Sequence, residues 1–587
     1  MSGRMAFLKK HIVKISLLLI VLSTGLLCFY AVKNYSGNTT SPQSRIETRN
    51  FIPGERNGAE TRNPPQGERN RQPESTNQLP GGQPDFNSTQ RTAPPNGRVM
   101  GGITSAGIKY SPQIVTYSVI FLALFIAAYY FLICKKMKIR PGHERILIFT
   151  LLCAGLLLRI SAATLTDGHP FDMSLFKNWA TAAANNLFQV YSSSRSSDYP
   201  PLYMYILFLI GKVAGMQAMS PYYTLPLRLP SILADIATSY LIYKLAVKYL
   251  SREISILVSA FYIFNPAIFI NSTFWGQVDS FFTLIVVSSF YLLSEKKTGL
   301  SSALFTAAVL MKPQGIIFLP VLFFELIRGK SFKNFLTAAA FALSTAVIII
   351  LPFTLNKGAL WIFKLFSNTM AEYPYASVNA FNFFSLIGKN YIKDGTTAFL
   401  LSYHNWGMIF IVIVTAFSWF IYIKGNSRAF ACAAALLQIA GVFMFSTRMH
   451  ERYLFPAVAL SILAFIYLKD KRLLLLSAGF STTVYINTHV VLFETGKGIN
   501  SISFSPVLIC TSFLNVLLFF YLVKVLFDIA VKKRIHTSSM LSTFFYQFKK
   551  IIQLIYPSVI AWFLFPNDLQ NVYFVVLQYG EQLFFLF

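Results

Sequence analysis

The stretch LYMYILFLIGKVAGM, residues 202–216, decides how this chain is arranged in a membrane. It is apolar enough to enter a bilayer, but it is shorter than the roughly 20 residues that a spanning helix needs. If it crosses, Lys244, Lys248, Arg252 and every later basic connector fall on the outer side. If it only enters and returns, all of them fall on the cytoplasmic side, where short loops are usually rich in Lys and Arg. We therefore predict a re-entrant or interfacial helix on the outer side.

Apolar segments near spanning length recur on both sides of this stretch. The chain has 587 residues and is 54% hydrophobic, which exceeds what a soluble core of this kind would bury. This pattern predicts an all-α polytopic membrane protein with a multi-helix bundle. The candidate segments are 12–32, 114–134, 146–163, 227–247, 254–270, 278–294, 299–311, 314–327, 334–352, 406–423, 428–446, 453–468, 472–490 and 504–526.

The charge balance supports the same membrane arrangement. Lys and Arg number 51 against 23 Asp and Glu, a net charge of +28 that would suggest nucleic acid in a soluble domain. Here the basic residues gather in short connectors between apolar segments, as in CKKMKIR at 134–140 and VKKR at 531–534. We therefore predict cytoplasmic loops at these places and no nucleic-acid partner.

Composition divides the chain into four parts. Residues 1–33 form a basic start and an apolar run that we expect to be a retained signal anchor. Residues 34–112 are rich in Pro, Asn, Gln, Gly and Arg and contain the near-repeat ETRNFIPGERN and ETRNPPQGERN, so we predict a disordered extracytoplasmic spacer. Residues 113–536 carry the polytopic domain, and 537–587 form an aromatic tail whose topology is open. The five cysteines show neither disulfide nor metal-ligand spacing.

Ionisable residues of both signs gather in the segments predicted to face outward. One set lies in TDGHPFD at 166–172, and another in TRMHERYLFP at 447–456. Charges near membrane depth are costly, so they are usually paired or functional. The cytoplasmic loops are short and mainly basic, and we expect no comparable mixed cluster there.

A sugar carried on a lipid phosphate fits such a site. Its polyprenyl tail would lie in the bilayer, and Arg, Lys and His would hold the phosphate and stabilise the charge that grows on it as the glycosidic bond breaks. A carboxylate would accept the proton of the attacking acceptor hydroxyl. Phosphate leaves without protonation, so one base and several cations suffice.

A series of motifs in residues 145–530 resembles a known family. FKNWA, VYSSSRSSDYPPLYMY, FNPAIFINSTFWGQVDS, MKPQG and RMHERYLFP follow one another on the predicted outer face. This order resembles bacterial membrane mannosyltransferases related to the second mannosyltransferase of GPI-anchor assembly, in the GT-C superfamily. The resemblance implies a polyprenyl-phosphate sugar donor, inversion at the anomeric carbon, a catalytic Asp in the first outer loop, and a pair of juxtamembrane helices on the outer face.

The candidate site residues follow from these motifs, each with a plainer alternative. Asp172 is the predicted base, with Asp167 as second choice, although Asp172 is also placed to cap a helix. Asp279 could instead cap a helix or bond Trp275, Lys312 could extend to water, and the TRMHERYLFP charges could anchor headgroups. Tyr199 could simply shape a turn. The predicted substrate-binding residues are Asp279, Gln277, Lys312, Arg448, His450, Glu451, Arg452 and Tyr199.

The sequence thus predicts an inverting glycosyltransferase in the cytoplasmic membrane with its active site on the extracytoplasmic face. Its predicted partners are the lipid donor, membrane lipids and an extracytoplasmic acceptor. No cofactor is expected, and the need for a divalent metal is left open. The alternatives are a flippase or transporter of a lipid-linked sugar, which would show internal repeats and charges reachable from both sides, and an inactive scaffold. Asp235, within a predicted span, is expected to pair with Arg159 or Arg228.

Overall fold

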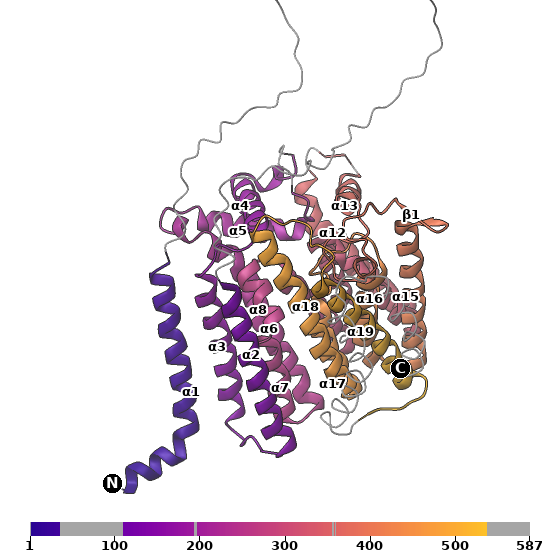
Figure 1. The fold of residues 1–587 in the computed structure, drawn as a ribbon. Coiled ribbons are helices and arrows are strands. Elements are labelled where there is room, and N and C mark those ends of the chain that lie inside the picture. The colour runs from indigo at the N-terminus through magenta and orange to yellow at the C-terminus, as the bar shows by residue number, and fades with distance from the viewer. Residues whose placement is uncertain (1, 36–109, 193–196, 355–356, 359, 537–587) are drawn as a thin grey trace, which may run out of the picture. The chain divides into compact units, whose positions relative to one another are not determined.

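The computed structural model describes residues 2–35, 110–192, 197–354, 357–358 and 360–536 (Figure 1). The predicted spacer and aromatic tail fall largely outside these residues. The described part is built from helices, and only one short hairpin of strands is found in it.

The element bounds match the predicted apolar segments closely. The helices before residue 300 are α1 (Ser2–Lys33), α2 (Ser111–Tyr129), η2 (Tyr130–Cys134), α3 (Glu144–Ala163), α4 (Pro170–Asn185), η3 (Leu187–Gln189), α5 (Pro201–Ala214), η4 (Ser220–Tyr222), α6 (Thr224–Tyr249), α7 (Arg252–Ile263), α8 (Pro266–Phe269), η5 (Ile270–Trp275), α9 (Asp279–Ser294) and α10 (Thr298–Met311). The later elements are η6 (Pro313–Phe318), α11 (Leu319–Gly329), α12 (Phe332–Ile350), η7 (Leu351–Phe353), α13 (Trp361–Ala371), α14 (Phe383–Leu386), β1 (Thr397–Ala398), β2 (Leu401–Ser402), α15 (Tyr403–Gly425), η8 (Arg428–Phe430), α16 (Ala431–Phe445), α17 (Pro456–Leu468), α18 (Arg472–Gly496) and α19 (Pro506–Ala530).

Eight helical segments are long and apolar enough to cross a membrane, which confirms the polytopic class. They are Val13–Lys33, Ser111–Cys134, Glu144–Ala163, Arg252–Trp275, Phe332–Phe353, Tyr403–Gly425, Arg428–Phe445 and Pro506–Ala530. The two most exposed of them, Ser111–Cys134 and Val13–Lys33, are strongly hydropathic, as contact with lipid requires. The long helices α6 and α18 are absent from this set because they carry charged or polar residues, several of which are buried against other helices.

Helix α5 is the segment that decided the predicted topology. It has only 14 residues and ends at Gly215, so it is too short to span a bilayer. In Figure 1 it lies beside α4 at the end of the bundle where α13 is also found. We call this the α4–α5 end. Its apolar face packs on α4 through Tyr203, Leu207 and Ile210.

The two short helices approach each other most closely at Gly211. A Cβ atom built on Gly211 would lie 2.1 Å from the carbonyl oxygen of Ala180 in α4. We expect Gly211→Ala to lower the free energy of unfolding by about 1–3 kcal/mol, because the α4 backbone must move to admit the methyl group. Denaturant unfolding in detergent micelles measures this change. Gly329→Ala is the matched control, since Gly329 has open space around it; equal effects of the two substitutions would contradict the close approach.

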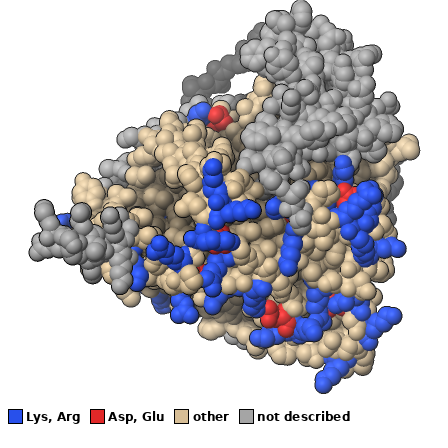
Figure 2. Space-filling model, turned by 90° about the horizontal axis from the view of Figure 1, so that it is seen from below, with Lys and Arg blue, Asp and Glu red and all other residues tan. Residues whose placement is uncertain are grey.

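Lys and Arg gather at the opposite end of the bundle. Figure 2 views this face from below and shows many blue side chains scattered over its described surface, with few red ones. We call it the basic end. This distribution is the one expected of cytoplasmic loops.

The expectation that this end has no mixed-charge cluster is wrong. Glu325 binds Arg328 and Arg428 and accepts a hydrogen bond from Tyr422. A second cluster joins Arg472 to Asp470 and Asp528, each at 2.9 Å. The sequence does not reveal these clusters as a whole because each joins several different elements, whose members lie up to 103 residues apart.

The buried charge of α6 has the partner that the sequence suggested. Nε of Arg159 lies 3.1 Å from Oδ2 of Asp235, and both side chains are fully buried. The other proposed partner, Arg228, instead donates to the backbone carbonyls of Ala163 and Thr273, each at 2.9 Å, and to that of Thr166. Arg228 therefore ties the end of α3 to η5.

Candidate active site

The loop between α3 and α4 is held against η5 by backbone contacts. The amide of His169 donates to the carbonyl oxygen of Trp275 at 2.9 Å, and the two rings stack with centroids 4.8 Å apart. Gly168 has a φ of +88°, and a Cβ there would meet Met173 and the Trp275 carbonyl. Only glycine fits this turn without strain. The loop thus fixes the start of α4 on η5.

Helix α4 begins three residues earlier than the sequence suggested. His169 is its N-cap, and Nδ1 of His169 accepts from the backbone amide of Asp172. The capping alternative for Asp172 is therefore wrong, because His169 and Pro170 already start the helix. Asp172 lies in the first turn, where its side chain is available for other contacts.

The carboxylate of Asp172 is oriented by two donors from the η5 turn. Nε1 of Trp275 donates to Oδ2 at 2.6 Å, and Nε2 of Gln277 donates to the same oxygen. Among the described residues, no hydrogen bond reaches Oδ1, and the side chain is 13% exposed. One oxygen is thus held in place, and the other has no hydrogen-bond donor among the described residues.

The backbone that carries these two donors is an irregular turn. Residues Ile270–Trp275 form a π-helical turn, and Gly276 ends it with a φ of +85°. A Cβ on Gly276 would lie 2.5 Å from Sδ of Met173 and 3.2 Å from Cγ of Arg228. Such π turns occur often at functional sites. Here the turn directs Trp275 and Gln277 toward α4.

A second carboxylate, Asp279, lies at the start of α9 and is buried. Its Oδ1 accepts from Nζ of Lys312, and its Oδ2 accepts from Nδ2 of Asn271 at 3.1 Å. Lys312 ends α10, where the helix breaks before η6, and it is 4% exposed. Lys312 therefore does not extend to water, and Asp279 does not bond Trp275, which contacts Asp172 instead.

Arg452 connects the two carboxylates. Its Nη2 lies 3.7 Å from Oδ2 of Asp172, its Nε lies 3.6 Å from Oδ2 of Asp279, and its Nη1 pairs with Glu451. The guanidinium also lies over the ring of Trp275, 5.0 Å from the centroid. Its buried Nε has no hydrogen-bond partner among the described residues. Three carboxylates thus face the two cations Arg452 and Lys312.

The charges around Asp172 keep it ionised. Burial alone would raise the pKa of Asp172, but Arg452, His169 and the hydrogen bonds from Trp275 and Gln277 outweigh it, so that the pKa lies below the ordinary value. The carboxylate is therefore charged at neutral pH.

Arg448, another charged residue of the 447–456 stretch, has a different role. Nε of Arg448 pairs with Asp394 at 2.7 Å and its Nη1 donates to the carbonyl of Met370 at 3.0 Å. The amide of Val378 donates to the carbonyl of Met449 at 2.9 Å. The loop after α13 is therefore tied to this stretch, and no hydrogen bond or ion pair joins Arg448 to Asp172 or Asp279.

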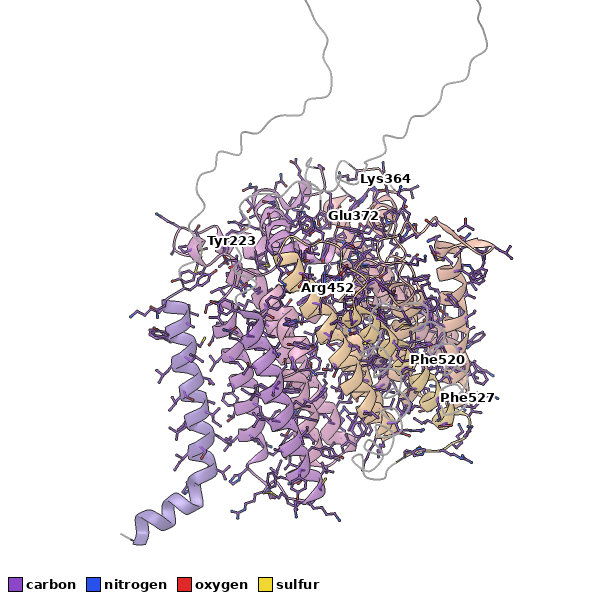
Figure 3. All side chains as sticks on the ribbon, viewed as in Figure 1. Tyr223, Lys364, Glu372, Arg452, Phe520 and Phe527 are labelled. Carbon is purple, nitrogen blue, oxygen red and sulfur yellow. The ribbon has the colours of Figure 1, made fainter. Side chains whose placement is uncertain are left out.

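The other predicted site residues lie at different distances from this centre. Tyr199 contacts it through a long hydrogen bond to Oε1 of Gln277, at 3.5 Å. Asp167 accepts from the hydroxyl of Tyr35 at the end of α1 and is not joined to Asp172 by any described contact. Figure 3 shows Arg452 inside the bundle near the α4–α5 end, with Glu372 closer to that end.

His450 packs between aromatic rings beside the charged centre. Its ring lies 4.9 Å from Tyr373 and 5.1 Å from Tyr453. Burial, together with the charges of Arg452 and Lys312, lowers the pKa of His450 to about 3. His450 is therefore a neutral donor or acceptor at physiological pH.

This lowered pKa makes folding sensitive to acid. The unfolded chain binds a proton at His450 below about pH 6.5 and the folded chain does not, so stability is present above that pH and is lost as pH falls. From about pH 7.5 to about pH 5.5 we expect wild type to lose about 1.4 kcal/mol more stability than His450→Gln. Denaturant unfolding of both proteins at the two pH values measures the difference. Parallel losses would show that His450 is not held neutral.

Several residues of this centre were not selected from the sequence. Trp275 was considered only as a partner of Asp279, and His169 only as a nearby charge. Nothing in the sequence was a reason to select Asn271 or Asp394, because the side chain that each one contacts is at least eight residues away in the chain. The one available sign was the density of polar residues in INSTFWGQVDS, a stretch adjoining an apolar segment.

The described part of the chain contains no candidate metal site. No group of three or more His, Cys, Asp or Glu side chains there is arranged to hold an ion. The need for a metal stays open, and the lack of a cofactor stays a prediction.

Comparison with known proteins supports the resemblance seen in the motifs. Residues 198–355 match the family model of the dolichyl-phosphate-mannose-protein mannosyltransferases. The matched segment includes Asp279 and Lys312 and excludes Asp172 and Arg452. No curated protein matches the chain. The family match supports the resemblance to GT-C mannosyltransferases and a glycosyltransferase activity in a multi-pass membrane protein.

Proposed function

We propose that this chain is an inverting glycosyltransferase that moves a sugar from a polyprenyl-phosphate donor to the hydroxyl of an extracytoplasmic acceptor. The carrying observation is the pair formed by Asp172 and Arg452. Oδ1 of Asp172 accepts no described hydrogen bond, and beside this carboxylate lies a largely buried guanidinium whose Nε has no hydrogen-bond partner among the described residues. A donor bound against this pair would have a base for the acceptor hydroxyl and a cation for its phosphate.

Asp172 would accept the proton of the acceptor hydroxyl as that oxygen attacks the anomeric carbon. Trp275 and Gln277 fix Oδ2, so Oδ1 would be the receiving atom. A positioned base contributes about 10²–10⁴-fold to such a step. The phosphate leaves as an anion, and the bond it releases passes its electron pair to a phosphate oxygen. A second carboxylic acid is not needed, unlike in glycoside hydrolysis.

Arg452 and Lys312 would hold the donor phosphate. The unpaired Nε of Arg452 can donate to a phosphate oxygen without breaking an existing hydrogen bond. Charge grows on that oxygen during the reaction, and a fixed cation in a buried site stabilises it. Asp279 and Glu451 keep both cations in position before the donor arrives.

The distribution of charge supports the outer face as the place of reaction. The candidate site lies near the α4–α5 end, and Lys and Arg gather at the opposite end (Figure 2). If the basic end faces the cytoplasm, the site faces outward.

Two features bear on the flippase alternative. The sequence predicted mixed-charge clusters on the outer side only, which counted against a flippase. The clusters found at the basic end weaken that argument. Both clusters are closed ion-pair networks, however, whereas Asp172 and Arg452 each have one hydrogen-bonding atom without a described partner. Two such atoms on neighbouring side chains favour the enzyme.

A transfer assay tests the proposal. Membranes from cells that produce the chain are loaded with radiolabelled polyprenyl-phosphate mannose, and the label is counted in products that no longer extract into organic solvent. We expect transfer from the lipid donor, and an inverted anomeric configuration in the product. Transfer from GDP-mannose in membranes depleted of the lipid donor, or retention of configuration, would contradict the proposal. Right-side-out vesicles whose product is open to added mannosidase would place the site outside.

A further inference from the structure

The short hairpin before α15 has an unusual tip. Thr397 pairs with Ser402 and Ala398 with Leu401, which leaves Phe399 and Leu400 as a two-residue turn. Their side chains are 96% and 91% exposed. These are the highest exposures among the large hydrophobic residues of the described chain. Neither residue is covered by any described part of the molecule.

The identity of these residues conflicts with the turn that they form. Two-residue hairpin turns favour Asn-Gly or Gly-containing pairs, because the backbone adopts positive φ. Phe399 has a φ of +59°, a conformation that a bulky side chain rarely adopts. A local rule broken without any gain inside the chain is expected at functional positions. Contacts outside the chain would explain an aromatic and an aliphatic residue here.

The hairpin is fixed to the end of a membrane span. Ser402 is the N-cap of α15, and the amide of Asn405 donates to its hydroxyl at 3.2 Å. Nε1 of Trp406 donates to the carbonyl of Ala398 at 3.0 Å. Helix α15 is one of the eight segments able to cross a membrane. The tip is thus held at the level where this span meets the membrane surface.

The direction in which the hairpin points also fits a position at the membrane surface. In Figure 1 the strand labelled β1 extends sideways from the end of α15, beyond the outline of that helix. Tyr403 and Trp406 begin the helix, and such aromatic residues are enriched where spans meet the headgroup region. The base of the hairpin is connected to the loop that holds Arg448, since the amide of His404 donates to the carbonyl of Asp394 at 2.9 Å.

We propose that Phe399 and Leu400 insert into the surface of the membrane that α15 spans and anchor the 372–402 loop to it. The occupant of this apolar tip is lipid at the boundary between headgroups and acyl chains. Apolar side chains gain free energy there, whereas full exposure to water would leave the strained turn without compensation. The proposal requires only that α15 crosses the membrane and is independent of the proposed reaction.

Fluorescence quenching tests the insertion. Phe399→Trp in the full chain, reconstituted in phosphatidylcholine vesicles, adds a tryptophan at the tip; the wild-type emission is subtracted. Lys393→Trp is the matched control, because Lys393 is an exposed residue of the same loop. We expect brominated lipid to quench the added emission at 399 more than that at 393, and iodide to do the reverse. The deciding quantity is the ratio of quenching by lipid to quenching by iodide at each position. If this ratio at 399 does not exceed the ratio at 393, the proposal is overturned. This holds whether water or another protein normally covers the tip.

A second variant separates anchoring from folding. Phe399→Gly combined with Leu400→Asn supplies the pair that a turn with positive φ at its first position prefers, and neither side chain it replaces is covered by the described part of the molecule. We expect unchanged or higher thermal stability in detergent, together with faster amide exchange of residues 394–402 in lipid nanodiscs than in wild type. Equal exchange rates in nanodiscs would mean that lipid does not hold the hairpin.

Discussion

Under the proposed reaction, Asp172→Asn is expected to transfer sugar about 10²–10⁴-fold more slowly than wild type, because the amide accepts no proton from the attacking hydroxyl. Asn has the same shape as Asp, and its carbonyl oxygen can still accept from Trp275 and Gln277. The fold should therefore persist while the base is lost. The measurement is the initial rate of label transfer from polyprenyl-phosphate mannose, normalised to the amount of folded protein.

Asp167→Asn is the control for this prediction. Asp167 lies in the same loop, but it accepts from Tyr35 and has no described contact with Asp172. We expect a much smaller loss of activity. If the two variants are equally slow, the loop as a whole matters and Asp172 is not the base; if only Asp167→Asn is slow, the second choice from the sequence was the correct one.

Lys312→Met destabilises the protein by about 3–5 kcal/mol, because it leaves the buried carboxylate of Asp279 without its closest cation. Arg452 lies 3.6 Å from Asp279 without a hydrogen bond and replaces Lys312 only in part. Denaturant unfolding in detergent micelles measures the loss. Lys333→Met makes the same substitution at an exposed lysine of α12 and is expected to change stability by no more than about 0.5 kcal/mol.

Removing both Lys312 and Asp279 tests whether the loss of stability comes from the unpaired Asp279 carboxylate or from the absence of Lys312 itself. Lys312→Met combined with Asp279→Leu leaves no isolated charge, so we expect it to be more stable than Lys312→Met alone. Its transfer activity should remain low, since the proposed phosphate site has lost one cation. A double variant no more stable than the single one would show that the two side chains do not depend on each other.

The fold could be predicted from the sequence because lipid imposes long apolar segments. The bounds of α3, α6 and α9 differ from the predicted segments by only a few residues. The prediction that residues 202–216 do not cross the membrane came from counting positive charges on each side of it, and α5 is indeed a helix of only 14 residues. The pairing of Asp235 with Arg159 could also be expected, because a charge within a span needs a partner.

The candidate site could be predicted only in part. The sequence brought the right stretches together, but it could not tell Arg448 from Arg452, which lie four positions apart on one loop. Their roles are decided by Asp394, a residue 54 positions away that holds Arg448. The role of Trp275 depended on a π turn and a positive φ at Gly276, and neither has a clear sequence signal. The same is true of the ion pairs at the basic end.

The excess of carboxylates around Arg452 has a consequence for turnover under the proposed reaction. Asp172, Asp279 and Glu451 outnumber Arg452 and Lys312 by one negative charge. The sugar-bearing lipid carries one negative charge on its phosphodiester, whereas the spent lipid carries a monoester with about 1.5 to 2. The spent lipid is therefore repelled more strongly than the fresh one. Such a centre is inhibited less by the spent lipid phosphate and exchanges it more readily for a fresh sugar-bearing lipid.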